Sequence, residues 1–339
     1  MSHGRTSQRH AGRSCSVPTR LHFKGQPFYV LLAELVGPTN LTTDGDKDLQ
    51  REVLQFQFTP QHVEDIRSSL THNAGAIPQF QLQVHLRFRS LHASGNQEDS
   101  YPSRLTVKVN GRNIALPAPI PSKTPNGSTE LICLPINIVS SCYLSSLVGN
   151  SVSLTWKAVP GEEFAAVVFL VRKLSPEMLL SDLRLRRWAM TETIIRKARR
   201  SASGEDISVT RLRISLICPL SKARISVPCR ARSCKHLECF DAARYLQVNE
   251  QRPRWVCPVC GQRATYASLI IDQLFANILE KSTGDFVVFN EDGSWTTSAE
   301  QQGCEIGCNG LSSASPPSLS SSVEQVRRPI KIEDVAVIE

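Results

Sequence analysis

The sequence predicts an α+β protein with several domains, and three observations carry that prediction. Alternating apolar and polar residues, the pattern of β-strands, dominate between about residues 50 and 172. Six of the eleven cysteines lie between Cys218 and Cys260, in a second and smaller region. Residues 1–20 and the serine-rich stretch beyond about residue 300 have the composition of disordered chain. A chain of 339 residues has room for two or three domains.

The first region is expected to be mainly β. Its strongest strand pattern runs from Phe80 to Phe88, where five apolar residues alternate with polar ones. Asn110-Gly111 is a favoured hairpin-turn dipeptide and follows a second alternating run. Residues 167–171 form a continuous apolar strand candidate, and Thr59-Pro60 predicts the start of one short helix.

A helical connector is expected next. Ser175-Pro176-Glu177 is a helix-start signal, and apolar residues continue with helical spacing as far as Trp188. Residues 184–200 contain seven basic residues and one acidic residue. We interpret this segment as a basic helix; a solvated charged helix face is the alternative.

Composition limits the function classes. No stretch approaches the length of about 18 apolar residues that a membrane span requires. Residues 1–25 have five basic residues and no apolar core, so they do not resemble a secretory signal. Because the cytosol and nucleus keep thiols reduced, eleven cysteines then favour metal binding over disulfides. The net charge of +8 keeps nucleic acid as a candidate partner.

Two ligand pairs predict a zinc site. Cys234 and His236 form one pair, and Cys257 and Cys260 form the other, about twenty residues later. Thiolate and imidazole ligands suit zinc, and a closed set of four leaves no position for a reactive water. We therefore expect one structural zinc ion; the alternative is a set of inert buried thiols with one ordinary histidine.

The other cysteines indicate that a second site has been lost. A RING has eight ligand positions in alternating pairs. The residues of this chain at those positions are, in order, Cys218, Ser221, Cys234, His236, Cys239, Ala242, Cys257 and Cys260. In the interleaved RING topology Ser221 and Ala242 fall in the same site, and neither can serve as its ligand. Cys218 and Cys239 would then be small buried apolar residues. A rival interpretation recruits Cys229 to a second site, which would still lack a ligand.

Several motifs together resemble the Siz/PIAS family of SUMO ligases. Residues 215–220, 227–231, 236–242 and 255–260 resemble its SP-RING zinc finger, and the match continues to Trp295. Upstream, Leu134-Pro135-Ile136-Asn137-Ile138 resembles the signature of its PINIT domain, with Val139 in place of the usual Thr. A SAP domain usually precedes PINIT in this family, but here only the short arm 1–20 takes its place. The chain is accordingly expected to be a short isoform or a divergent member.

The resemblance implies the following domain boundaries. We expect a disordered basic arm at 1–20, a β-rich PINIT domain at 21–174, a helical basic connector at 175–205, a one-zinc RING-like SP-RING domain with a C-terminal helix at 206–296, and a disordered tail at 297–339.

The resemblance also implies a function and its site residues. The chain would be a nuclear SUMO-protein ligase without a catalytic residue or covalent intermediate of its own, acting in transcription and chromatin regulation. The SUMO-charged conjugating enzyme would dock on Leu220, Leu246 and Pro258; for Leu246 plain core packing is the alternative. Pro135, Ile136, Asn137 and Ile138 would help to orient the substrate, a transcription factor or chromatin protein.

The C-terminal residues resemble two SUMO-related motifs. Ile330-Lys331-Ile332-Glu333 fits the SUMO acceptor pattern, with Lys331 as the acceptor. Val335, Val337 and Ile338, flanked by acids, resemble a SUMO-interacting strand that adds to a sheet edge. A hydrophobic chain end without a partner is the alternative.

Two rival functions stay open at this point. The first is a zinc-dependent chromatin or transcription-factor adaptor without ligase activity, and the second is a ubiquitin ligase. The zinc region, residues 206–282, carries twelve basic and six acidic residues, which favours an acidic protein partner, with DNA contact unproven.

Overall fold

The computed structural model describes most of the chain, in two compact units. The described residues are 23–42, 48–71, 78–92, 98–123, 129–188, 212–289 and 294–297. The first unit ends at Lys173, and the second begins at Leu174. The arm 1–20, the last part of the expected connector and the tail motifs lie outside the described residues. No helix in the described part of the chain is long and apolar enough to cross a membrane.

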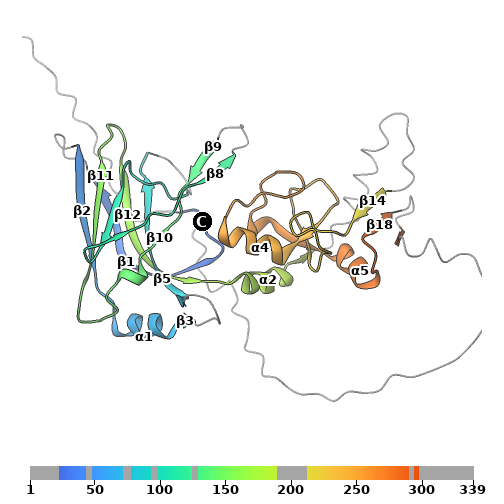
Figure 1. The fold of residues 1–339 in the computed structure, drawn as a ribbon, viewed down its shortest axis with the longest axis horizontal. Coiled ribbons are helices and arrows are strands. Elements are labelled where there is room, and N and C mark those ends of the chain that lie inside the picture. The colour runs from blue at the N-terminus through green and yellow to red at the C-terminus, as the bar shows by residue number, and fades with distance from the viewer. Residues whose placement is uncertain are drawn as a thin grey trace, which may run out of the picture. The chain divides into compact units, whose positions relative to one another are not determined.

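The first unit is built from two four-stranded antiparallel sheets and two hairpins (Figure 1). The first sheet has the order β1-β12-β5-β10, and its strands are β1 (Tyr29–Leu41), β12 (Phe164–Lys173), β5 (Leu82–Ser90) and β10 (Ile136–Asn137). The second has the order β2-β11-β6-β7, and its strands are β2 (Leu49–Phe56), β11 (Asn150–Lys157), β6 (Thr106–Val109) and β7 (Arg112–Ile114). The hairpins pair β3 (Leu70–Thr71) with β4 (Gln79–Phe80), and β8 (Ile120–Lys123) with β9 (Thr129–Ile132).

Residue alternation explains how the sheets pack. Val84, Leu86 and Phe88 of β5 are fully buried in the main core, together with alternate residues of β11 and β12. The other face of β12 is also buried, because Phe23 packs there with Val167 and Phe169. A strand covered on both faces is expected to be continuously apolar, as residues 167–171 are. The expected strand from Phe80 to Phe88 is divided at Gln81 between β4 and β5.

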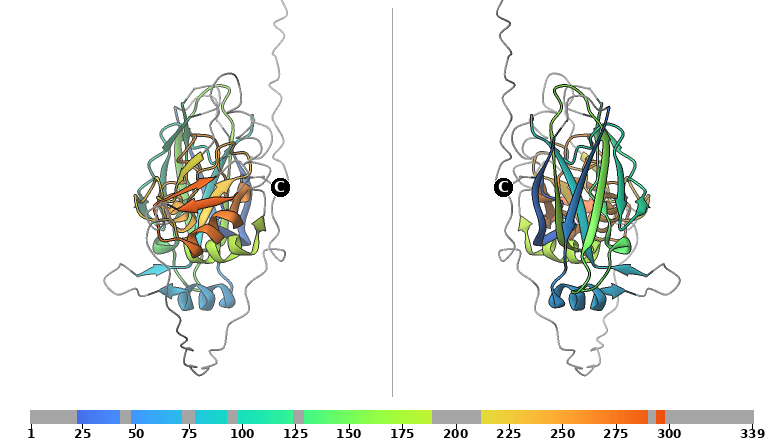
Figure 2. Two further views of the ribbon diagram at one scale, coloured as in Figure 1. Left: turned by 90° about the vertical axis from the view of Figure 1, so that its right-hand side faces the viewer. Right: turned by 90° about the vertical axis from the view of Figure 1, so that its left-hand side faces the viewer.

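The short helix lies where the sequence predicts it. Helix α1 (Pro60–Ser68) begins after Thr59, whose hydroxyl accepts a hydrogen bond from the His62 amide. Proline in the first turn costs no hydrogen bond, because the first amides of a helix have no partner inside it. Val63 and Ile66 face the core, and Figures 1 and 2 show α1 beyond the ends of the strands.

The second unit has shorter strands, joined by long loops. One sheet has the order β13-β17-β15-β16, with β13 (Arg187–Trp188), β17 (Leu269–Asp272), β15 (Pro228–Ala231) and β16 (Phe240–Asp241). The other has the order β14-β18-β19, with β14 (Leu212–Ser215), β18 (Phe286–Phe289) and β19 (Trp295–Thr297). The helices described in this unit are α2 (Pro176–Leu185), α4 (Ala242–Gln251) and α5 (Gln273–Lys281).

The start of the expected connector is part of this second unit. Helix α2 begins as predicted, with Ser175 as its cap, but it ends at Leu185. The prediction that the helix continues to Trp188 is wrong, because Arg187–Trp188 form β13, paired in parallel with β17. The phenol oxygen of Tyr266 lies 2.8 Å from Leu179 O and 2.6 Å from Asp182 Oδ2, so that its one proton is shared between two acceptors on α2 and fixes this helix within the unit. Tertiary pairing here overrides the helical spacing of the sequence.

The expected fold class is confirmed. A β-rich unit precedes a smaller mixed unit with a Cys and His cluster, and α5 provides the C-terminal helix.

Candidate metal centre and partner-binding loops

The structure brings the four predicted zinc ligands together. Sulfur and nitrogen atoms of Cys234, His236, Cys257 and Cys260 all lie within 4.8 Å of one another. The Cys234 and Cys260 sulfurs are 3.9 Å apart, and His236 Nε2 is 3.3 Å from the Cys257 sulfur. Within the described ranges, these four form the one group of this kind. Three sulfurs and one imidazole at these distances fit a tetrahedral zinc ion.

Two loops supply the ligands. Cys234 and His236 lie between β15 and β16, while Cys257 and Cys260 lie between α4 and β17. In the second loop the Gly261 amide donates to Cys257 O, and Gly261 has a φ of +70°. Glycine adopts this left-handed conformation without the Cβ penalty of other residues. The turn thereby brings the sulfurs of Cys257 and Cys260 to the same side.

The electrostatics of the cluster suit metal binding. His236 Nδ1 lies 2.9 Å from Glu238 O, a partner that leaves Nε2 facing the sulfurs. Burial lowers the pKa of His236, so its imidazole is neutral at pH 7, the form that binds metal. Burial also raises the pKa of the Cys234 thiol above its ordinary value. Without metal this thiol is protonated, so binding zinc must release its proton.

The position of the lost site is held by hydrogen bonds. Cys218 and Cys239 are almost completely buried, and neither joins the cluster. The Asp241 amide donates to the Cys218 sulfur at 3.3 Å. Its Oδ2 accepts from the Ser226 amide at 2.7 Å, the Ser226 hydroxyl at 2.6 Å and the Val227 amide at 3.1 Å. A carboxylate thus connects the loops that a metal would connect in a two-zinc RING.

Sequence reasoning missed Asp241 as an organising residue. Its Oδ1 also accepts from the Arg244 amide at 3.1 Å, which makes it the cap of α4. An aspartate directly before the helix-forming run Ala242-Ala243-Arg244 is a recognisable cap signal. Burial alone would raise the pKa of this carboxyl, but its hydrogen bonds, from Ser226 above all, outweigh burial and lower it.

Cys229 does not rebuild a second metal site. Its side chain is fully buried in β15, and it joins no group of three ligands among the described residues. Burial raises its pKa far above the ordinary value for a thiol. The rival interpretation that recruits Cys229 therefore gains no support.

The three residues expected to contact the conjugating enzyme differ in exposure. Leu220 is 37% exposed, and Pro258 is half-buried. Leu246 is completely buried, so the structure contradicts its assignment as a contact. It lies on the inward side of α4 with Ala242 and Tyr245, and the alternative of core packing is the correct one.

One exposed apolar residue near the metal was not predicted. Val256, directly before Cys257, is 40% exposed. It follows Trp255, whose φ of +51° is unusual for a large side chain. The Trp255 amide donates to Asn249 Oδ1 at 2.7 Å, which holds this conformation. No sequence pattern signals a left-handed tryptophan.

The predicted substrate-orienting signature lies mostly inside the first unit. Ile136 and Ile138 are buried in the main core, Pro135 is half-buried, and only Asn137 is exposed. The Ile138 amide donates to Val84 O at 2.8 Å, which anchors the segment to β5. The signature side chains therefore contribute mainly to folding. Lys331, Val335, Val337 and Ile338 lie outside the described residues.

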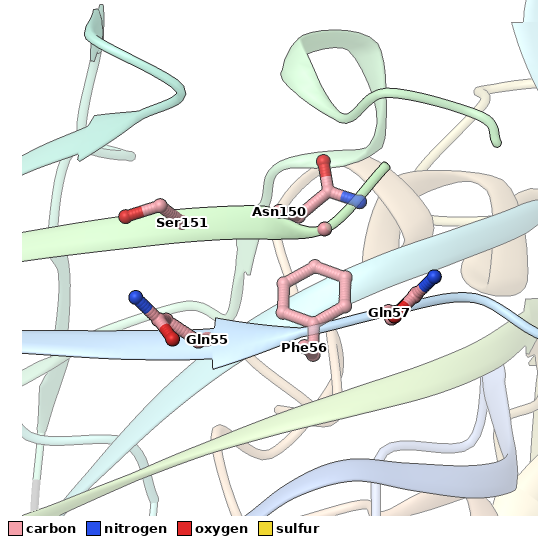
Figure 3. A pocket seen from close by; sticks show the side chains of 6 residues that line it. Gln55, Phe56, Gln57, Asn150 and Ser151 are labelled. Atoms are coloured by element: carbon pink, nitrogen blue, oxygen red, sulfur yellow. The ribbon is translucent and has the colours of Figure 1, made fainter. Parts of the chain in front are cut away.

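A cleft in the first unit is lined by uncharged residues. It has a volume of about 390 Å³ and lies where β2 ends and β11 begins (Figure 3). Its lining residues are Gln55, Phe56, Gln57, Gly149, Asn150 and Ser151. No titratable side chain lines it, so the cleft provides neither an acid nor a base.

Family models match both units. Residues 20–172 match the PINIT domain, and residues 214–263 match the MIZ/SP-RING zinc finger. This match and the Cys and His cluster together assign one structural zinc ion to the second unit.

The curated relatives of this chain are named as E3 SUMO-protein ligases. The chain is 40% identical over 279 residues to the E3 SUMO-protein ligase PIAS2 of Homo sapiens, covering 81% of this chain and 45% of that protein. It is 39% identical over 273 residues to the E3 SUMO-protein ligase PIAS4 of Mus musculus, covering 79% of this chain and 53% of that protein. The chain thus spans about half the length of the curated relatives it matches.

Solved structures share the fold. The SUMO E3 ligase SIZ1 of S. cerevisiae matches with a TM-score of 0.66 at 22% identity, covering 86% of this chain and 98% of that chain. SIZ2 matches with a TM-score of 0.59 at 21% identity, covering 80% of this chain and 98% of that chain. The chain thus contains a PINIT domain and a MIZ/SP-RING zinc finger, and in sequence and fold it is similar to proteins of the PIAS/Siz family.

Proposed function

We propose that this protein is a SUMO-protein ligase that binds a SUMO-charged conjugating enzyme through its zinc-finger loops. The observation that carries the proposal is the Cys and His cluster of a zinc finger that also has an exposed Leu220 and a half-buried Pro258, in a chain similar to proteins named E3 SUMO-protein ligases. Nuclear localisation and substrates among transcription factors or chromatin proteins belong to the same proposal.

The chemistry is transfer of SUMO from a thioester to an amine. The substrate lysine nitrogen attacks the thioester carbonyl, an isopeptide bond forms, and the C–S bond to the conjugating enzyme breaks. The enzyme's sulfur leaves as a thiolate, and the amine loses a proton to solvent. The ligase contributes orientation, which can lower a barrier by several kcal/mol without any reactive group of its own.

Zinc supports this function by fixing the loops. A closed set of four ligands has no open position, so the ion holds Cys257–Cys260 rigid and takes no part in transfer. Zinc fixes the loop that carries Pro258, and the hydrogen bonds of Asp241 hold the segment that contains Leu220, which reduces the ordering cost of docking. The basic surplus of residues 206–282 would steer an acidic partner surface.

The decisive experiment measures discharge of SUMO from the charged conjugating enzyme onto free lysine. The purified chain should accelerate discharge, and Leu220→Ala should reduce the acceleration about tenfold, as for a central interface residue. Met178→Ala is the matched control, because Met178 is 44% exposed on α2 and has no place in the proposed surface. Equal loss in both variants, or none in Leu220→Ala, would remove Leu220 from the docking surface.

The same assay separates the rival functions. Binding of the conjugating enzyme without faster discharge would favour the non-catalytic adaptor. Acceleration with ubiquitin-charged enzymes instead of SUMO-charged ones would favour a ubiquitin ligase.

The tail motifs form a separate part of the proposal. Lys331→Arg should remove self-modification if Lys331 is the acceptor, with Lys281→Arg as the control in the folded unit. Replacing Val335, Val337 and Ile338 by Ala should weaken SUMO binding if they form an added strand.

A further inference from the structure

A buried arginine connects the zinc loop to the following helix. Arg230 lies in β15, paired with Ile270 of β17, and its side chain has no exposed surface. It is the largest fully buried side chain of the described residues. Burying a guanidinium is costly unless its donors are paired, so its partners indicate what it does.

The partners of Arg230 lie on two different elements. One terminal nitrogen forms an ion pair with Asp272, which is itself 1% exposed on its side chain. The other, Nη1, donates to the main-chain oxygen of the zinc ligand His236 at 3.1 Å. Nε has no hydrogen-bond partner among the described residues. Only a planar fork with separate donors can reach both partners at once.

Asp272 extends the connection to α5. Its Oδ1 accepts from the Phe275 amide at 3.1 Å and caps this helix. A continuous set of bonds therefore runs from the His236 main chain through Arg230 and Asp272 to the first turn of α5.

Stability alone does not explain this pair. Replacing a buried ion pair by well-packed apolar residues of similar volume is often neutral or stabilising, so the burial of this pair is weak evidence for a role in stability. What apolar residues cannot supply is the hydrogen bond to the His236 carbonyl. The His236 ring is already fixed at Nδ1 by the Glu238 carbonyl, and Arg230 fixes the main chain that carries the ring.

We propose that Arg230 is a positioning residue of the metal centre, which holds the His236 main chain so that Nε2 faces the three sulfurs. The proposal rests on the zinc site and not on ligase activity, so either can fail without the other. Residues around metal ligands commonly change metal affinity 10–100-fold when they are replaced.

The test compares variants of the full chain by zinc affinity, cobalt(II) absorption and melting temperature. Arg230→Met removes the fork, and the double variant Arg230→Met with Asp272→Asn also removes the unpaired carboxylate while keeping a cap for α5. Arg230→Lys keeps the charge without the fork. Arg252→Met is the matched control, because Arg252 is exposed.

We expect zinc affinity, measured by competition with a chelator, to fall roughly tenfold in both Met variants. The visible bands of bound cobalt should shift in both, since they report ligand geometry. The double variant should recover the melting temperature but not the cobalt spectrum or the affinity. Arg252→Met should match the unmodified chain.

Two outcomes would overturn the proposal. One is a double variant that recovers melting temperature, affinity and cobalt spectrum together, since Arg230 would then act on stability alone. The other is unchanged affinity and spectrum in all three Arg230 variants. If Arg230→Met does not fold, Arg230→Lys and the double variant still decide between these results.

Discussion

The two units of this protein are stabilised in different ways. The first has strands of up to thirteen residues and a continuous apolar core between two sheets. Among the described residues of the second unit no strand is longer than four residues, and long loops are fixed by the Cys and His cluster and by polar contacts. Short strands contribute few cross-strand pairs, so the second unit depends on individual side chains to a degree that the first does not.

The same contrast occurs inside the second unit. At one position four ligands lie together as a zinc ion requires, and at the other Asp241 accepts hydrogen bonds from Ser226, Val227 and Arg244 while Cys218 and Cys239 are buried. A carboxylate with several charge-assisted hydrogen bonds can replace a metal as a link between loops. It cannot match the metal in energy, because structural zinc contributes on the order of 10 kcal/mol.

The largest effect should come from loss of a ligand. Cys257→Ala should abolish zinc binding and unfold the second unit, at a cost on the order of 10 kcal/mol, while the first unit stays folded. Zinc content per chain and amide signals from each unit, recorded by NMR, measure this.

The zinc count is an independent check of the same comparison. The unmodified chain should hold one zinc ion. Two ions per chain, or a second unit that stays folded in Cys257→Ala, would contradict the division into a metal-bearing and a metal-free position.

Loss of the Asp241 charge should have the next largest effect. Asp241→Asn keeps the cap of α4 but weakens the bonds from Ser226 and Val227, which should destabilise the second unit by about 2–3 kcal/mol. Ser226→Ala, which removes one hydroxyl donor, should cost about 1 kcal/mol. Denaturant unfolding with zinc in excess provides the measurement.

The size of the Asp241 effect depends on pH. The pKa of Asp241 lies below 3.8 in the folded chain, so its contribution is complete above the unfolded pKa and disappears as the pH falls through the folded one. The difference in the free energy of unfolding between the unmodified chain and Asp241→Asn should therefore be constant from pH 5 to 8. A difference that shrinks as the pH rises would argue against a charged Asp241.

The sequence predicts the ligand set well because spacing alone determines it. Cys234, His236, Cys257 and Cys260 could be assigned from two short pairs, and the alternation in β5 and the caps Thr59 and Ser175 also match. Such signals are local, so no knowledge of distant residues is needed.

The remaining features depend on contacts between distant residues. Leu246 resembles an interface residue in sequence, but the packing of α4 turns it inward. Arg230 meets Asp272 across 42 positions, and Trp188 leaves its helical pattern to pair with β17. A pattern within one segment contains no information about these partners.

The third largest effect should be a loss of stability of the first unit in acid, caused by His85. Burial, followed by the charge of Arg87, lowers the pKa of His85 to about 3 from 6.5. Between these values the unfolded chain binds a proton that the folded chain does not, so stability falls as the pH falls below 6.5. The slope is about 1.4 kcal/mol per pH unit, or about 2 kcal/mol at pH 5.

His85→Gln should remove this dependence, because glutamine does not titrate. Hydrogen exchange of β5 and β12 amides between pH 7 and 5, corrected for intrinsic rates, reports the first unit alone. Equal pH slopes in the two chains would show that other groups control its acid stability.

The smallest effect should come from a cysteine at the metal-free position. Cys239 is almost completely buried, and burial raises the pKa of its thiol well above 9.0, so it remains a protonated apolar residue. Cys239→Ala should cost about 1 kcal/mol of packing and leave one zinc ion per chain.

The matched variant Cys260→Ala removes an exposed cysteine and should release the zinc ion. The more buried of these two thiols is therefore expected to matter less for stability. Cys260 is one of the four metal ligands, whereas Cys239 only fills space in the core. Loss of zinc in Cys239→Ala would show that this thiol ligates metal, and the metal-free position would then need a different explanation from the bonds of Asp241.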